Sequence, residues 1–322
     1  MGMKRIGVLT SGGDTPGMNA AVRAVVRTAC EQGIEVLGIE SGYRGLIENR
    51  MRELDIRSVS DIIHRGGTML YSARCPEFKE EEGMQTAIAN CKERGIDGIV
   101  VIGGDGSFRG ARDLSLRGIP CIGIPGTIDN DIASSDYTIG YDTCLNTIMQ
   151  MVDRVRDTVE SHSRCVVVEV MGNRCGDLTL NSGIAVGATA IVIPEIRDDI
   201  EKHVIQRIRR TQKTDKKHFI VMVAEGIGGT EALARKIEKE CKVETRAVIL
   251  GHVQRGGSPT ARDRVVASEM GYHAVQLLLQ GIGNRVIVVR DDKIVDLDIY
   301  EALKMERSVN TELYKIAHEI SI

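Results

Sequence analysis

Short runs of apolar, mostly β-branched residues alternate along the chain with longer stretches whose apolar positions recur at helical spacing. The runs are apolar at almost every position, which is typical of strands that are buried on both faces of a parallel sheet. The sequence predicts strands at Arg5–Thr10, Glu35–Ile39, Gly98–Ile102, Cys121–Ile124, Cys165–Val170, Ala190–Ile193, Phe219–Ala224, Ala247–Leu250 and Val286–Val289. It predicts helices that include Met18–Gln32, Glu82–Arg94, Asn146–Glu160, Glu231–Cys241 and Arg262–Leu279. This alternation predicts an α/β fold.

The length of 322 residues favours two lobes, each with a mostly parallel sheet sandwiched by helices. We expect a larger lobe of residues 1–140 plus about 256–305, and a smaller lobe of 141–255 plus about 306–322. Because no low-complexity linker separates the lobes, the chain is expected to cross between them more than once. The active site is expected in the cleft between them.

Composition narrows the classes of partner. A net charge of −3 argues against nucleic acid as a partner of the whole chain, and no apolar run reaches the eighteen residues of a membrane span. No signal peptide is recognisable at the N-terminus. The eight cysteines lack CxxC spacing, which favours reduced thiols in a cytoplasmic protein.

Glycine-rich loops follow two of the predicted strands. Gly12-Gly13-Asp14 and Gly103-Gly104-Asp105 both read as strand, Gly-Gly-Asp, then helix. Glycine lets backbone N–H groups approach a phosphate closely, and the start of the next helix favours an anion. For the first loop, taken alone, a tight strand–helix turn is the less favoured alternative. The pattern is neither the dinucleotide fingerprint nor the P-loop.

The loop at Asp105 has the composition of a magnesium site. Mg²⁺ in phosphate-transfer sites binds one or two carboxylates together with phosphate oxygens, and Asp105 can supply a carboxylate. A similar loop occurs in diacylglycerol kinases and NAD kinases. It therefore indicates a nucleotide phosphate without identifying the acceptor.

A third loop carries two carboxylates. Asp129 and Asp131 lie two residues apart after a predicted strand, so one can act as a general base while the other contacts metal or water. An Asx-rich turn is the alternative reading of this segment. Further along, His252 and Arg255 follow a strand and can clamp an anion. Arg164, Arg246, Arg23 and Arg27 can each be read singly as solvated arginines.

Taken together, these segments resemble the bacterial ATP-dependent 6-phosphofructokinases. The resemblance spans nearly the whole chain and keeps the order of the family's motifs. The matching segments are Ile6–Asp14, Tyr71–Arg74, Ile102–Ser107, Pro125–Asp131, Val168–Gly172 and Gly251–Pro259. The fold it implies is phosphofructokinase-like.

The resemblance implies a role for each matching residue. It implies that Asp129 is the base for the 1-hydroxyl of fructose 6-phosphate, and that Asp105 holds Mg²⁺. The remaining catalytic residues that it implies are Thr127, Arg74 and Asp131. Those implied for ATP are Gly13, Arg74, Cys75, Gly104, Asp105, Gly106 and Ser107. Those implied for fructose 6-phosphate are Thr127, Ile128, Asp129, Arg164, Met171, Gly172, Glu225, Arg246, His252 and Arg255.

The resemblance also implies assembly and regulation. It implies a homotetramer in which Arg164 and Arg246 reach into the neighbouring subunit's active site. A second site between subunits would bind ADP or phosphoenolpyruvate as effectors. The residues implied for it are Arg23, Arg27, Arg156, Lys213, Lys216, Lys217 and His218.

The chain departs from the family pattern at three places. Asn173 and then Arg174 follow Gly172, where the family commonly has arginine directly. Thr189 stands where the family often has a glutamate, and Ile56 where it sometimes has an arginine. The effector site is therefore expected to respond unusually.

Three other functions compete with this interpretation. In pyrophosphate-dependent phosphofructokinases the positions of Gly106 and Gly126 look like Asp and Lys, so glycine at both favours ATP as the donor. A lipid or NAD kinase would leave Gly251–Pro259 unexplained. A nucleotide-binding regulatory protein without turnover would have no need of a base at Asp129.

Overall fold

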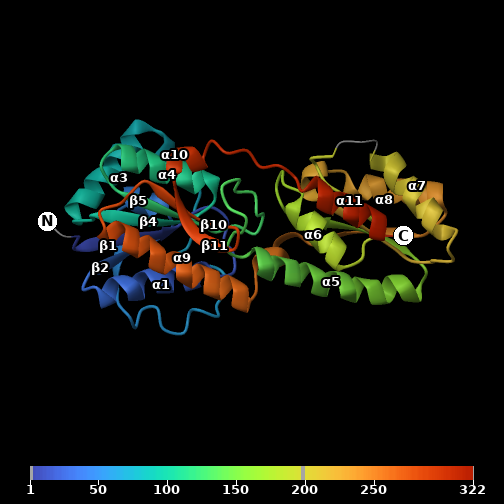
Figure 1. Cartoon of the computed structure of the whole chain (residues 1–322), viewed down its shortest axis with the longest axis horizontal. Coiled ribbons are helices and arrows are strands. Elements are labelled where there is room, and N and C mark those ends of the chain that lie inside the picture. The colour runs from blue at the N-terminus through green and yellow to red at the C-terminus, as the bar shows by residue number, and fades with distance from the viewer. Residues whose placement is uncertain (1–2, 197–199, 322) are drawn as a thin grey trace. The chain divides into compact units, whose positions relative to one another are not determined.

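The computed structural model describes residues 3–196 and 200–321. The chain forms two compact units, and it passes between them more than once (Figure 1). Unit 1 comprises Met1–Thr127, Ile132–Thr143 and Arg255–Arg307, and unit 2 comprises Ile128–Asp131, Cys144–Gln254 and Ser308–Ile322.

Unit 1 is built on a seven-stranded sheet in the order β11-β10-β5-β4-β1-β2-β3. Its strands are β1 (Arg5–Thr10), β2 (Glu35–Ile39), β3 (Met51–Leu54), β4 (Gly98–Gly103), β5 (Cys121–Pro125), β10 (Arg285–Arg290) and β11 (Lys293–Asp298). The five central strands are parallel, while β3 and β11 run antiparallel at the two edges. The order changes direction at β1, because β2 lies on one side of it and β4 on the other.

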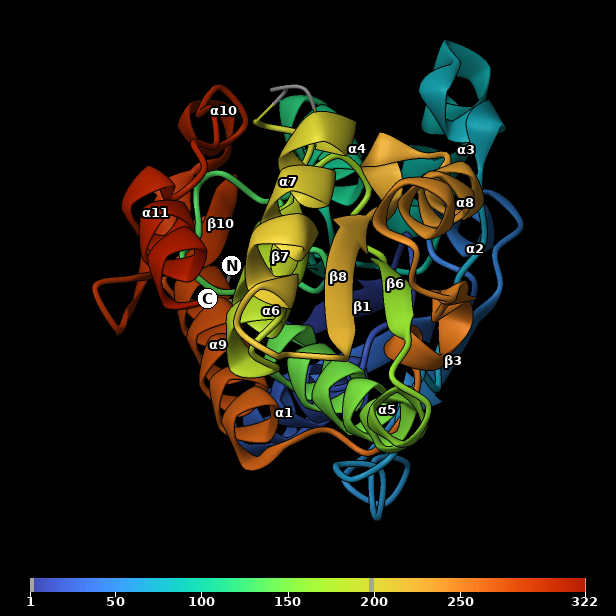
Figure 2. The same cartoon turned by 90° about the vertical axis from the view of Figure 1, so that its right-hand side faces the viewer.

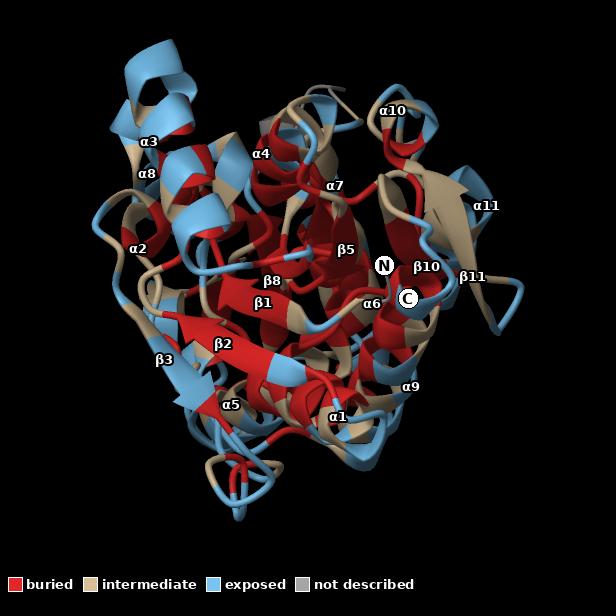
Figure 3. Cartoon of the chain, turned by 90° about the vertical axis from the view of Figure 1, so that its left-hand side faces the viewer, coloured by how far each residue is buried: buried red, intermediate tan, exposed pale blue. Residues whose placement is uncertain are grey.

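Helices cover both faces of this sheet, as Figure 1 shows. On one face lie α1 (Met18–Glu31) and α9 (Ala261–Leu279), which pack closely enough for Gly271 to contact Ala24. On the other lie α2 (Tyr43–Ile47), α3 (Glu81–Glu93), α4 (Asp105–Leu116) and α10 (Ile299–Ala302), together with the short 3-10 helix η1 (Pro76–Lys79). Strands β1 and β2 are buried almost to their ends, whereas edge strand β3 is largely exposed (Figure 3).

Unit 2 has a four-stranded, fully parallel sheet in the order β7-β8-β6-β9 (Figure 2). The strands are β6 (Cys165–Val170), β7 (Ala190–Val192), β8 (Phe219–Ala224) and β9 (Thr245–Ile249). The side chains of α7 (Ile200–Gln212) and α8 (Thr230–Cys241) form one core with the sheet, and α6 (Asp177–Ala185) contacts β7 and β8. The remaining elements are α5 (Tyr141–Ser161), α11 (Thr311–Ile320), η2 (Glu225–Ile227) and η3 (Gly251–Arg255).

The predicted α/β fold is confirmed, and each of the nine predicted strands is present. Two edge strands, β3 and β11, escaped prediction because charged residues interrupt their apolar pattern. Strand β9 was placed two residues late, since polar Thr245 and Arg246 occupy its start. Both errors arise where a strand has one solvated face and so lacks the continuous apolar run of a central strand.

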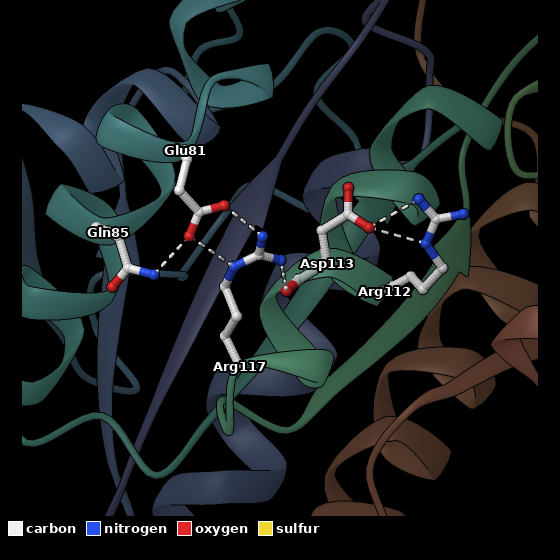
Figure 4. A network of polar contacts seen from close by, with 5 residues as sticks. All are labelled: Glu81, Gln85, Arg112, Asp113 and Arg117. Atoms are coloured by element: carbon white, nitrogen blue, oxygen red, sulfur yellow. Dashed lines mark hydrogen bonds and ion pairs between the residues drawn. The ribbon is translucent and has the colours of Figure 1, made fainter.

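A polar network on the surface joins α3 to α4 (Figure 4). Arg117 donates to the Glu81 carboxylate at 2.6 Å and to the Asp113 carbonyl at 3.0 Å, so it also satisfies an end of α4. Gln85 donates to the same Glu81 carboxylate at 2.6 Å. Because the Glu81 side chain is 62% exposed, water screens the ion pair and its contribution to stability is small.

We predict that Phe108→Ala destabilises unit 1 by about 3–5 kcal/mol, since it empties a fully buried site. Phe108 is 1% exposed, and its ring lies 2.8 Å from the position that a Cβ on Gly123 would take. Urea unfolding followed by circular dichroism measures the loss. Arg117→Ala is the matched surface control, and a loss as large as that of Phe108→Ala would contradict this ranking.

Candidate active site

The loops after β1 and β4 lie side by side at the carboxyl edge of the unit 1 sheet. The Ser11 N–H donates to the Ile102 carbonyl at 2.9 Å. A Cβ on Gly103 would lie only 2.4 Å from the Ser11 carbonyl oxygen, so glycine is required for this approach. In open α/β sheets, ligands bind where neighbouring strands lead off in opposite directions, which is the position of these two loops.

The start of α4 forms an open cradle for an anion. The helix begins at Asp105, with Gly104 as its N-cap and no side chain capping it. A Cβ on Gly104 or Gly106 would meet nothing within 4 Å, so there is room beside these backbone N–H groups. The helix terminus favours a phosphate there. Asp105 is exposed at the same end.

The loop after β1 has a different local structure despite its similar sequence. Helix α1 begins only at Met18, after Gly12 and Gly17 have adopted φ values of 89° and 105°. The guanidinium of Arg255 covers Gly13, because a Cβ there would lie 1.9 Å from Arg255 Nη1. Arg255 also donates to the Asp14 carbonyl at 3.4 Å. The structure thus places Arg255, expected at the sugar phosphate, against a loop expected at ATP.

Residues 68–75 line the same edge of the sheet. The Ser72 hydroxyl donates to the Gly12 carbonyl at 2.6 Å, and Thr10 Oγ1 donates to the Tyr71 carbonyl at 2.8 Å. Arg44 donates to the Arg74 carbonyl at 2.9 Å, and Arg74 is exposed. Cys75 follows, partly buried, and burial raises the pKa of its thiol.

The loop after β5 carries the predicted carboxylates. Asp129 is 9% exposed and Asp131 is half-buried. Thr127, two residues before Asp129, is the last residue of the first segment of unit 1. Asn130 has a φ of 48°, a left-handed conformation that asparagine tolerates, and its amide donates to the Asp177 carboxylate at 3.0 Å. Asp177 was missed by the sequence analysis. It lies 47 residues away at the start of α6, and nothing in the local sequence links it to this loop.

Three loops of unit 2 meet at the carboxyl ends of its adjacent strands β8, β6 and β9. Met171 and Gly172 follow β6, Glu225 follows β8, and exposed His252 follows β9. One oxygen of Glu225 accepts from the N–H groups of Gly172 at 3.2 Å and Asn173 at 2.7 Å. The Glu225 carboxylate therefore holds the loop that carries Gly172.

The departure at residue 173 has a conformational reason. Asn173 has a φ of 55°, and Gly172 before it has a φ of 136°. Asparagine is enriched in the left-handed region, whereas longer side chains rarely adopt it. Asparagine at residue 173, where the family commonly has arginine, therefore suits the left-handed backbone of this loop.

Arg164 and Arg246 lie at the opposite edge of the unit 2 sheet. Arg164 precedes β6, Arg246 is near the start of β9, and both donate to Glu244, at 2.8 Å and 2.6 Å. The hydrogen bond from Arg164 and the charge of Arg246 lower the pKa of the Glu244 carboxyl. These two arginines are therefore not brought together with Gly172, Glu225 and His252 within unit 2.

The predicted effector residues fall into two groups. In unit 2, burial and the nearby charge of Arg156 lower the pKa of Lys216. In unit 1, Arg23 and Arg27 lie one turn apart on α1, and burial and the charge of Arg27 lower the pKa of Arg23. The other predicted residues, Lys213, Lys217 and His218, lie between α7 and β8.

The two other departures differ in burial. Thr189 is 1% exposed, and its carbonyl accepts a hydrogen bond from buried Arg207 at 2.7 Å. Ile56 is 56% exposed. A threonine at 189 is therefore part of the unit 2 interior, whereas Ile56 presents an apolar side chain to solvent.

Among residues 3–196 and 200–321, no three His, Cys, Asp or Glu side chains converge in a way that could hold a metal ion. In the same described part of the chain, no helix has the length and apolar character to cross a membrane.

Comparison with known proteins gives one consistent result. The family model for phosphofructokinase matches residues 5–278. The chain is 54% identical over 320 residues to the ATP-dependent 6-phosphofructokinases of Bacillus subtilis and Bacillus licheniformis, covering 99% of this chain and 100% of each relative.

Solved structures give the same relationship. A phosphofructokinase from Saccharomyces cerevisiae superimposes with a TM-score of 0.88 and 34% identity, covering 99% of this chain and 48% of the yeast chain. The chain thus spans about half the length of that relative. A pyrophosphate-dependent phosphofructokinase from Marinobacter aquaeolei has a TM-score of 0.86 at 21% identity, covers 96% of this chain, and shares the fold.

Proposed function

The chain belongs to the phosphofructokinase family, and we propose that it is an ATP-dependent 6-phosphofructokinase. It transfers the γ-phosphate of ATP to the 1-hydroxyl of D-fructose 6-phosphate, giving fructose 1,6-bisphosphate and ADP. The observation that carries the proposal is the open cradle at the start of α4, with Asp105 exposed beside Gly104 and Gly106. The full-length similarity to ATP-dependent relatives supports it.

The glycine loops of unit 1 bind the nucleotide in this proposal. Backbone N–H groups of Gly104, Asp105 and Gly106 at the α4 terminus attract the phosphates, and Gly13, Arg74, Cys75 and Ser107 complete the site. Asp105 would hold Mg²⁺, which when bound neutralises phosphate charge and aligns the transferred group. Arg74 adds a second positive charge. Positioning and charge stabilisation supply most of the catalysis of phosphoryl transfer.

Asp129 acts as the general base. Its carboxylate takes the proton of the 1-hydroxyl while the oxygen bonds to the γ-phosphorus and the bond from that phosphorus to ADP breaks. The hydrogen bond from Asn130 to Asp177 fixes the left-handed turn next to Asp129, which supports this assignment. Thr127, Ile128 and Asp131 are the neighbouring residues of the loop.

In this proposal, residues of several different loops bind the sugar phosphate. Met171, Gly172, Glu225 and His252 would contact it from the carboxyl edge of the unit 2 sheet, and Arg255 would add a positive charge. We place Arg164 and Arg246 in the site of a neighbouring subunit. Their position at the amino ends of β6 and β9, apart from that edge, supports a homotetramer with active sites at the subunit interfaces.

ATP, not pyrophosphate, is the donor. The space next to Gly106 is open, whereas an aspartate there would add charge and bulk where an α-phosphate must fit. At Gly126 a Cβ would lie 3.2 Å from Met18 and 3.3 Å from Ile102, so the side chain of a lysine would have to displace them. The ATP-dependent relatives at 54% identity agree with this choice.

We place the enzyme in the cytoplasm, where its eight free cysteines would remain reduced. Its effectors would be ADP and phosphoenolpyruvate. The mutual repulsion of Arg156 and Lys216 supports an anion site there, because a bound anion would relieve it. Buried Thr189 carries no carboxylate, so residue 189 supplies neither a metal ligand for ADP nor a group that repels phosphoenolpyruvate.

We expect ATP, fructose 6-phosphate and Mg²⁺ to give fructose 1,6-bisphosphate and ADP, while pyrophosphate in place of ATP gives none. A coupled assay with each donor, with other sugar phosphates and without an acceptor measures this. In Gly106→Asp, ATP turnover should fall while the urea midpoint stays close to wild type, because a Cβ at residue 106 meets no protein atom within 4 Å. Faster turnover with pyrophosphate than with ATP would overturn the donor assignment.

For Asp129→Ser we predict a fall in kcat of roughly 10²- to 10⁴-fold, which is the usual contribution of a general base. The KM for fructose 6-phosphate should change much less, since proton removal matters only in the transition state. Steady-state kinetics measure both constants. Asp157→Ser, on the exposed surface of α5, is the control. A near-normal kcat in Asp129→Ser would remove the base assignment.

Sedimentation of the wild-type enzyme should show a particle of four chains. ADP or phosphoenolpyruvate should shift its fructose 6-phosphate saturation curve, and Lys216→Ala should weaken that shift without lowering the maximal rate. Lys239→Ala, on α8, is the control. A saturation curve that neither effector moves would disprove the effector site and leave the catalytic assignment intact.

A further inference from the structure

Asp263 is a fully buried carboxylate that the mechanism above does not use. It lies in the first turn of α9, where Thr260 caps the helix by accepting the Asp263 N–H. Its exposed fraction is 0%. A buried carboxylate is costly unless its oxygens accept hydrogen bonds. The groups that satisfy it lie more than one hundred residues away in the sequence.

Both oxygens of Asp263 accept from residues 137–143. Oδ1 accepts from the Tyr137 hydroxyl at 2.5 Å and from the Gly140 N–H at 2.7 Å. Oδ2 accepts from the Thr143 N–H at 2.9 Å and from the Thr143 hydroxyl. The Thr143 hydroxyl in turn accepts the Thr260 N–H at 3.0 Å. One side chain of α9 therefore holds a seven-residue segment at three positions.

That segment is bonded to the loop after β5. The Thr138 hydroxyl donates to the Thr127 carbonyl at 2.6 Å, and the Ile139 N–H donates to the Pro125 carbonyl at 2.9 Å. The Gly126 N–H donates to the Gly103 carbonyl at 3.0 Å, which extends the contact to β4. Thr127 immediately precedes the residues that carry the proposed base.

The same segment is bonded to the loop after β1. The Thr15 hydroxyl donates to the Ile139 carbonyl at 3.1 Å. A Cβ on Gly17 would lie 2.6 Å from the Ile139 side chain, and one on Gly140 would collide with Thr15 Oγ1. Gly140 has a φ of 100°, so other residues would be strained there. Both proposed loops thus contact the segment that Asp263 holds.

We propose that Asp263 is a positioning residue, which sets the nucleotide loop at Gly13–Gly17 and the loop at Pro125–Thr127 relative to each other. It acts through residues 137–143 and need not contact a substrate. This assignment rests on the proposed function for its effect on turnover. Its effect on the two loops themselves does not depend on which reaction the protein catalyses.

The chemistry of the contact explains why an acid is required. Each oxygen of Asp263 faces one backbone N–H, from Gly140 or from Thr143. The hydroxyls of Tyr137 and Thr143 can rotate, but a backbone N–H cannot become an acceptor. In Asp263→Asn the amide group must face one of these two N–H groups whichever way it turns. At least one backbone hydrogen bond is therefore lost.

The test compares Asp263→Asn and Thr138→Val with wild type. We expect kcat to fall by roughly tenfold to 10²-fold in Asp263→Asn, because small misplacements of reacting groups have effects of this size. Because each loop keeps its own contacts, KM for ATP should change by less than about threefold. Thr138→Val removes the hydrogen bond from the Thr138 hydroxyl to the Thr127 carbonyl and should lower kcat in the same sense. Asp298→Asn is the control, since Asp298 caps α10 by accepting the N–H groups of Tyr300 and Glu301, and its kcat should equal that of wild type.

Hydrogen exchange supplies a readout that does not require turnover. The amides of Gly126 and Ile139 should exchange faster in Asp263→Asn, while those of the β10–β11 pair keep their wild-type rates. Wild-type kcat together with unchanged exchange at Gly126 and Ile139 would overturn the positioning role. Should Asp263→Asn fail to fold, Thr138→Val decides in the same way. Absence of fructose 6-phosphate phosphorylation by wild type would instead defeat the proposed function, with the exchange result still testing the loops.

Discussion

The pairing of β1 with β4 is the constraint on which the proposed nucleotide site depends. These strands are parallel neighbours at the centre of the unit 1 sheet, with Thr10 opposite Ile102, so their following loops begin at the same level. One loop leads to α1 and the other to α4, and ligands of open α/β sheets bind where neighbouring strands lead off in opposite directions. This geometry requires glycine at residue 103, because the Ser11 carbonyl lies where a side chain on residue 103 would be.

Most of the central architecture was predictable from sequence, because central parallel strands are buried on both faces. The bounds of β1, β2, β6 and β8 agree with those predicted, whereas edge strands β3 and β11 were missed. The Gly-Gly-Asp loops were recognisable because each follows a buried strand and precedes a helix, the position at which backbone N–H groups can bind a phosphate. The contacts of Asp177 and Asp263 were not, since each acts on residues 47 or more positions away and neither belongs to a local motif. Sequence patterns of period two or 3.6 report burial, and they carry no information about which distant backbone group a carboxylate will meet.

The two Gly-Gly-Asp loops show how far one motif can diverge in structure. Asp105 is the first residue of α4 and is exposed beside an open anion cradle. Asp14 lies four residues before α1, and its carbonyl accepts a hydrogen bond from Arg255. The first loop therefore brings a cation to Gly13, while the second presents a carboxylate. A phosphate chain with a bound divalent ion needs both kinds of group, so in the proposed nucleotide site the two loops would have complementary roles.

The charges at the amino edge of the unit 2 sheet fit a role outside their own unit. Glu244 accepts from both Arg164 and Arg246, so one carboxylate faces two guanidinium groups and a net positive charge remains. Arg246 has an exposed side chain, and water weakens its pair with Glu244. A phosphate arriving from a neighbouring subunit would find two planar donors already oriented by one acid, which lowers the entropy lost when they bind it. In the proposed tetramer, Glu244 would compete with the ligand for the same donors and would hold them in place until that ligand binds.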